Sequence, residues 1–176
     1  YFGGIGVGVE IVTEDLDYFD QQANIADVGS RLSGLGDSKS PYIQEPTTSG
    51  TFFSWFDELV DYADTEGTAT LGTRQVEAGG YTVFTDEAEF YSTLQAFLNS
   101  TAGAKFSSSV AVTADADGTL SGVRATAIQA DYSGSINGEA MKQVDAMVDL
   151  RDIVDNWEFE AFPWSTRYRN NVTVYI

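Results

Sequence analysis

Acidic side chains are the main source of possible chemistry in this chain, because it contains no histidine and no cysteine. That absence removes thiolate nucleophiles, imidazole bases and zinc sites built from these two residues. Acid pairs such as Asp57-Glu58 and Asp115-x-Asp117 remain. A glycosidase needs two carboxyl groups facing each other across a cleft, whereas both pairs fall on positions predicted to be solvated. We therefore expect no enzyme, no cofactor and no metal site.

The spacing Asp115-x-Asp117-Gly118 begins like a calcium-binding loop. The twelfth position counted from Asp115 is Thr126, so the glutamate that closes such a loop is missing. Asp-Gly between two alternating segments is instead a strong hairpin signal. We expect two antiparallel strands joined by this turn, over about 110–113 and 123–128.

The glycine-rich start, GGIGVGVEIV, suggests a phosphate loop but has the wrong order and spacing. A dinucleotide fingerprint places G-x-G-x-x-G after a strand and at the start of a helix. Here Gly4, Gly6 and Gly8 alternate, and the β-branched residues follow them. We interpret the segment as the lead-in to a strand over about 7–13, where glycine lets another backbone approach closely.

The net charge narrows the range of partners. The chain has 27 acidic and 9 basic residues and a net charge of −18. Such a field repels phosphate backbones and anionic lipid surfaces, so we expect no nucleic-acid partner. The acidity also fits a soluble surface or salty surroundings. With 176 residues, 43% of them hydrophobic, the chain can bury the core of a single domain over 1–176.

Helical periodicity appears in four segments. The clearest is TFFSWFDELVDYADTEG, in which Phe52, Phe53, Phe56, Leu59, Val60 and Ala63 form one apolar stripe. The other helices are expected over about 20–35, 86–98 and 137–156, and the buried face of the last one includes Val144 and Val148. We interpret 37–50 as a loop and 68–80 as a polar Gly/Thr-rich linker. A last strand is expected over about 157–162.

These elements predict an α+β fold. Without a helical insertion over 36–106, their order is β-α-β-β-α-β, the ferredoxin-like arrangement. The insertion lies between the first helix and the second strand. We expect a four-stranded antiparallel sheet with two helices on one face and the insertion packed at its edge or on top.

Three stretches, in this order, resemble one family: YFGGIGVGVEIV, TFFSWFDELVDYA and EFEAFPWSTRY. They are similar to the Tyr-Phe and valine-rich first strand, the Ser-Trp-hydrophobic-acidic helix and the Phe-Pro-Tyr-Ser segment of Patched and Niemann–Pick type C proteins. This family is the sterol-transporter branch of the resistance–nodulation–division superfamily. The chain departs from it in having no cysteine and in staying polar after Phe162-Pro163.

The resemblance implies the second large extracytoplasmic domain of a membrane transporter for sterol or other lipid cargo. Such a domain works with the sister extracytoplasmic domain of the same transporter and does no covalent chemistry. The membrane would be reached through parts of the protein outside this chain, which starts without methionine and has no apolar run near the ~20 residues of a spanning helix. An alternative is a stand-alone or receptor-like ectodomain that binds a protein ligand in a surface assembly.

Two groups of residues are candidates for function. Aromatic side chains in excess of one buried helical stripe would contact the sister domain, lipid cargo or a protein ligand. These candidates are Trp55, Tyr62, Phe53 and Trp164, and we expect Trp55 and Tyr62 to form a solvated pair on one flank of their helix. The sequons Asn99-Ser100-Thr101 and Asn171-Val172-Thr173 make Asn99 and Asn171 candidate glycosylation sites.

Overall fold

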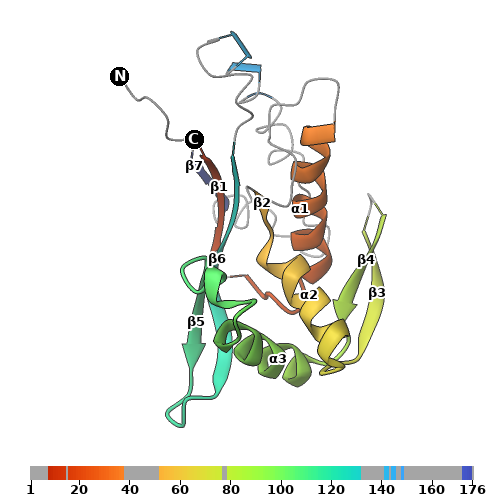
Figure 1. Cartoon of the computed structure of the whole chain (residues 1–176), viewed down its shortest axis with the longest axis vertical. Coiled ribbons are helices and arrows are strands. Elements are labelled where there is room, and N and C mark those ends of the chain that lie inside the picture. The colour runs from red at the N-terminus through yellow and green to blue at the C-terminus, as the bar shows by residue number, and fades with distance from the viewer. Residues whose placement is uncertain are drawn as a thin grey trace. The chain divides into compact units, whose positions relative to one another are not determined.

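The computed structural model describes residues 8–14, 16–37, 52–76, 79–131, 141–142, 144–145, 148 and 172–175. Over these residues the chain is a mixed α+β protein (Figure 1). The elements are, in order, β1 (Gly8–Glu14), α1 (Gln22–Asp37), β2 (Phe52–Phe53), α2 (Trp55–Glu66), β3 (Leu71–Val76), β4 (Gly79–Phe84), α3 (Glu87–Asn99), the short 3-10 helix η1 (Ala104–Phe106), β5 (Val110–Ala114), β6 (Leu120–Asp131) and β7 (Val172–Tyr175).

The chain divides into two compact units. The first consists of Tyr1–Val12, Val28–Phe53 and Ile128–Ile176, and the second of Thr13–Asp27 and Ser54–Ala127. β1, α1 and β6 each contribute residues to both units. Most of the described core, including every fully buried aromatic side chain, belongs to the second unit.

The strands of the first unit follow the order β2-β6-β1-β7. β2 pairs antiparallel with the end of β6, with Phe52 opposite Ala130 and Phe53 opposite Gln129. The prediction that Phe52 and Phe53 belong to a helix is therefore wrong. The helix starts two residues later because Ser54 is its N-cap and accepts a hydrogen bond from the Asp57 amide.

α3 follows its sequence signals closely. Asp86 is the N-cap, and its Oδ1 accepts a hydrogen bond from the Glu89 amide at 2.9 Å. Phe90, Leu94 and Phe97 are fully buried, as the periodicity predicts. The helix packs against α2 and β4, and Phe90 meets Phe84 edge-on with ring centroids 5.4 Å apart. These contacts form the centre of the second unit.

The prediction of a linker over 68–80 is wrong, because β3 and the start of β4 lie there and the two strands form an antiparallel hairpin. Leu71 lies opposite Phe84, and Val76 lies opposite Gly79. The Gly/Thr-rich composition hid the strands. β4 packs against α2 and α3, and its last residue also bonds to a side chain of α1. The side chain of Gln22 receives the Phe84 amide at 2.8 Å and donates to the Phe84 carbonyl at 3.3 Å. One buried glutamine thus satisfies both backbone groups at the end of β4.

The hairpin predicted around Asp117-Gly118 is confirmed. β5 pairs antiparallel with the first part of β6, with Val112 opposite Val123. Gly118 takes the left-handed conformation at φ 86°, which glycine adopts without strain. The Asp117 carboxylate receives the Thr119 amide at 2.9 Å, and this bond is the main reason why its pKa lies below the usual value.

The described residues near the C-terminus correct two further expectations. Residues 141–142, 144–145 and 148 are helical, but Val144 and Val148 are exposed rather than buried. Periodicity identifies an apolar stripe, whereas the packing of other elements decides whether it is covered. β7 was not predicted, because the segment around it is rich in arginine and asparagine. The strand predicted over 157–162 lies outside the described residues.

Candidate functional site

Trp55 is the first residue of α2, and its side chain is 0% exposed. Its ring meets Phe56 edge-on with centroids 5.7 Å apart. The expectation that it lies on a solvated flank is wrong, because the first turn of α2 enters the core immediately after the Ser54 cap. The indole Nε1 is buried and has no hydrogen-bond partner in the described part of the chain. Trp55 is therefore a core residue of the second unit.

Tyr62 is half-buried on α2 and contacts Phe97 of α3, with ring centroids 5.5 Å apart. It covers the junction of the two helices and keeps part of its ring in solvent. Of the aromatic candidates, it is the one whose described side chain can reach a partner. The backbone of Phe53 pairs in the sheet, but its side chain lies outside the description, as does the whole of Trp164. The structure therefore does not bring the candidates together as one site.

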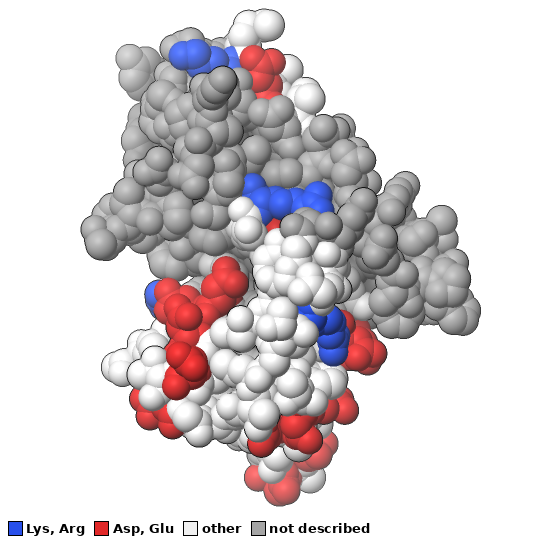
Figure 2. Space-filling model, turned by 90° about the vertical axis from the view of Figure 1, so that its right-hand side faces the viewer, with Lys and Arg blue, Asp and Glu red and all other residues white. Residues whose placement is uncertain are grey.

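The solvent-facing side of α2 is strongly acidic. It lies opposite the buried Phe56, Leu59 and Ala63, as helical geometry requires. Figure 2 shows one face of the molecule, on which acidic side chains lie in several groups. We use the term acidic face of α2 for the exposed acids on this side, which are Asp57, Glu58, Asp61 and Asp64.

The charge is unevenly divided between the two units. The second unit holds 16 of the 27 acidic residues and only 3 of the 9 basic ones, which leaves it with a net charge of −13. The first unit carries the remaining −5. The field of the second unit therefore attracts cations and basic segments and repels anions.

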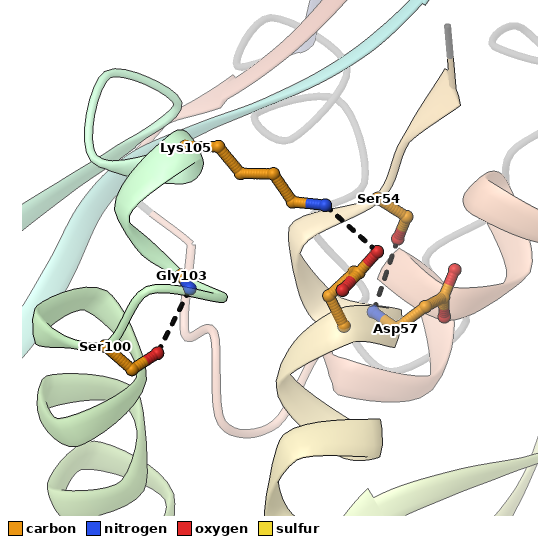
Figure 3. Close-up of polar contacts among 6 residues, drawn as sticks. Ser54, Asp57, Ser100, Gly103 and Lys105 are labelled. Atoms are coloured by element: carbon orange, nitrogen blue, oxygen red, sulfur yellow. Dashed lines mark hydrogen bonds and ion pairs between the residues drawn. The ribbon is translucent and has the colours of Figure 1, made fainter. Parts of the chain in front are cut away.

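One of the three basic residues of the second unit sits beside the acidic face of α2. Lys105 of η1 places its Nζ 3.2 Å from a carboxylate oxygen of Glu58 (Figure 3). The same Nζ lies 5.0 Å from the centre of the Phe106 ring. Both partners of the ion pair are about half exposed, so it contributes roughly 0–1 kcal/mol. It joins η1 to α2, and sequence spacing gave no signal for it.

Within the acidic face, Asp57 has an altered titration. The pKa of its carboxyl is raised above the usual 3.8, first because nearby protein limits its solvation and then because Asp61 and Glu58 repel its charge. The Ser54 side chain acts in the opposite direction. Ser54 Oγ also receives the Asp57 amide at 3.4 Å (Figure 3). Because Asp57 reaches solvent, the effect on stability is modest.

The described residues hold no group of three or more acidic side chains arranged to bind a metal ion. Among the same residues, no helix is long and apolar enough to cross a membrane. The acidic face of α2 can attract a basic partner electrostatically. A partly exposed aromatic residue, Tyr62, lies on the same helix.

The structure describes one of the two candidate glycosylated asparagines, Asn99. Asn99 is the last residue of α3, its side chain is exposed, and its Nδ2 donates a hydrogen bond to the Gln95 carbonyl at 3.0 Å. Asn171 lies outside the described residues. Asn99 is thus the glycosylation candidate with a defined environment.

Comparisons of the chain with protein-family models, with curated proteins and with solved structures find no match. The resemblance of the three ordered motifs to a transporter family therefore stays a prediction. The described residues form an α+β protein with antiparallel strand pairs and the helices α1, α2 and α3.

Proposed function

We propose that this chain is an extracytoplasmic domain of a membrane transporter similar to the Patched and Niemann–Pick type C proteins, with sterol or another lipid as cargo. It acts beside the sister extracytoplasmic domain of the same transporter. The domain itself does no covalent chemistry, and energy coupling belongs to membrane-embedded parts of the protein. The three ordered sequence motifs are the first support for this proposal.

Strand order is the observation that carries the proposal. β1 lies between β6 and β7, and β5 pairs with β6. A ferredoxin-like sheet has its first strand between its third and fourth, with the second strand beside the third. On this proposal β1, β5, β6 and β7 are those four strands. α1 and the helix to which residues 141–142, 144–145 and 148 belong are the two helices, and the segment from β2 to η1 is the insertion.

The insertion supplies the proposed contact with a partner. Tyr62 lies on α2, contacts Phe97 and remains partly exposed. An aromatic ring of this kind contributes a large apolar area at an interface while its hydroxyl stays hydrated. Trp55 has no part in this contact, because it is buried in the core.

The test uses the complete protein in lipid vesicles with a photoreactive sterol. We first expect the full-length sequence to contain apolar segments of ~20 residues on both sides of this chain. The second expected result is covalent sterol labelling within this domain that unlabelled sterol suppresses. Labelling that excess sterol does not suppress, or a full-length sequence without such segments, would overturn the proposal.

A contact variant locates the partner surface. Tyr62→Ala should weaken binding of the separately expressed sister domain, because it removes a partly exposed aromatic residue from the junction of α2 and α3. Tyr91→Ala is the matched control, since Tyr91 is a half-buried tyrosine on α3 that packs on Phe90. Equal losses of binding for the two variants, measured by calorimetry, would argue against a contact centred on α2.

A second candidate is a receptor-like ectodomain that binds a protein ligand, and the acidic face of α2 favours it. A surface with this charge attracts basic partners, and their association weakens as salt screens it. The double variant Asp61→Asn/Asp64→Asn should then reduce both the affinity for a basic ligand and its salt dependence. A binding constant independent of salt would count against this candidate.

A further inference from the structure

The sequon Asn99-Ser100-Thr101 lies at the end of α3, on the surface of the second unit. Asn99 and Thr101 are exposed, and Ser100 is half-buried. An N-linked glycan is bulky and polar, so it fits only where it can extend into solvent. The folded second unit can carry a glycan at Asn99 without displacing a core side chain.

The folded turn holds the sequon through several hydrogen bonds. Asn99 Nδ2 donates to the Gln95 carbonyl at 3.0 Å. The Ser100 amide and hydroxyl both donate to the Phe97 carbonyl, at 2.8 and 2.7 Å. The Gly103 amide donates to Ser100 Oγ at 3.1 Å (Figure 3). A glycosylating enzyme would have to break this arrangement in order to bind the sequon.

Gly103 shows how tightly the turn is closed. A Cβ atom placed on it would lie 2.0 Å from the Phe97 carbonyl oxygen. That oxygen belongs to the backbone of α3 and cannot move aside as a flexible side chain would. A larger residue at this position would therefore open the turn that follows the sequon.

We propose that Asn99 accepts an N-linked glycan, and that the transfer takes place before the end of α3 folds. This inference rests on the extracytoplasmic location proposed above. In the transfer, the Asn99 amide nitrogen attacks the anomeric carbon of an oligosaccharide carried on a lipid diphosphate. The nitrogen–carbon bond forms, the bond from that carbon to the diphosphate oxygen breaks, the lipid diphosphate leaves, and the amide nitrogen loses one proton.

The order of events follows from geometry. The transferase must bring the Asn99 amide and the Thr101 hydroxyl into one active site, because the sequon is defined by both side chains. In the folded unit the Asn99 backbone is helical, and its side-chain amide donates a hydrogen bond to the Gln95 carbonyl. Since Ser100 is also held in the closed turn, the nascent chain is the better acceptor.

The first experiment translates the full chain behind a signal peptide in the presence of endoplasmic-reticulum microsomes. Every variant also carries Asn171→Gln, so that any glycan must be attached at Asn99. The protease-protected chain should carry one glycan, removable by an N-glycanase and lost in Asn99→Gln and Thr101→Ala. Ser100→Ala is the matched control, because it keeps the sequon and should keep the glycan. A protected chain without a glycan would overturn the proposal.

The second experiment tests the order of events with the purified full chain, a solubilised transferase and lipid-linked oligosaccharide. Urea-unfolded chain diluted into the assay should be modified at Asn99, whereas folded chain should not. Gly103→Val should be modified without unfolding, because its turn cannot close. Equal modification of folded and unfolded wild-type chain would overturn the order of events. Neither glycosylation experiment involves sterol cargo. The transporter proposal would be contradicted by the absence of sterol labelling, so the two proposals can fail independently.

Discussion

At the scale of single residues, the start of α2 combines a core side chain with a surface charge. Trp55 is fully buried, and two residues later Asp57 is exposed with a raised pKa. The positions of both residues follow from Ser54, because its capping hydroxyl sets where the helix begins. One helical turn therefore contains both the largest buried side chain of the second unit and part of its acidic face.

Trp55→Ala should lower the free energy of unfolding by about 3–5 kcal/mol, the usual cost of truncating a buried aromatic side chain. Trp55→Phe should cost clearly less, because the buried indole Nε1 makes no hydrogen bond among the described residues that phenylalanine would lose. Urea denaturation of both variants measures the difference. A loss below about 0.5 kcal/mol for Trp55→Ala is typical of a surface position and would contradict the buried placement.

Asp57→Asn should stabilise the protein at neutral pH. A carboxyl whose pKa is raised by folding destabilises the folded state above its unfolded pKa, and the cost disappears as pH falls through the folded value. The advantage of the asparagine variant should therefore shrink as the pH approaches the ordinary carboxyl value of 3.8. Melting temperatures of both proteins across this range are the measurement. An advantage that stays constant with pH would point to a cause other than ionisation.

At the scale of the elements, α2 ends unfavourably. Its last turn contains Asp64 and Glu66 and no basic residue, although the carbonyl end of a helix favours positive charge. The helix nevertheless stops cleanly, because Gly67 takes the left-handed conformation at φ 61° and its amide bonds to the Ala63 carbonyl. The two acids at this end therefore carry some cost in helix stability.

Glu66→Lys should stabilise the protein by about 0.3–1 kcal/mol through the helix dipole. Glu58→Lys makes the same charge change in the first turn, where it should destabilise, because it removes a favourable acid and the partner of Lys105. Both variants lower the net negative charge equally, so comparing them separates the dipole from general repulsion. Thermal unfolding at low salt gives both values, and two shifts of the same sign would refute the dipole explanation.

At the scale of the whole molecule, charge is the dominant property. The net charge of −18 is concentrated in the second unit, which carries −13 and three basic residues. Like charges at this density destabilise the compact state. The same field repels anions and attracts cations.

Raising potassium chloride from a low concentration to molar levels should raise the melting temperature, because salt screens repulsion among exposed acids. Asp61→Asn/Asp64→Asn should respond less to the same titration, since it removes two charges from the acidic face of α2. Differential scanning calorimetry of both proteins provides the test. An equal salt response would indicate a general effect of salt on apolar burial rather than charge screening.

The sequence by itself determined the elements whose causes are local. Asp86 and the stripe of Phe90, Leu94 and Phe97 predicted α3, and Asp117-Gly118 predicted the β5–β6 turn, because capping and turn formation depend on residues a few positions apart. The tertiary structure decided what depends on distant segments. β4 packs against α2 and α3 and bonds to Gln22 of α1, β2 pairs with the end of β6, and Trp55 is buried by the core around it. Pairing and burial require a partner surface, and a pattern within one segment does not identify that partner.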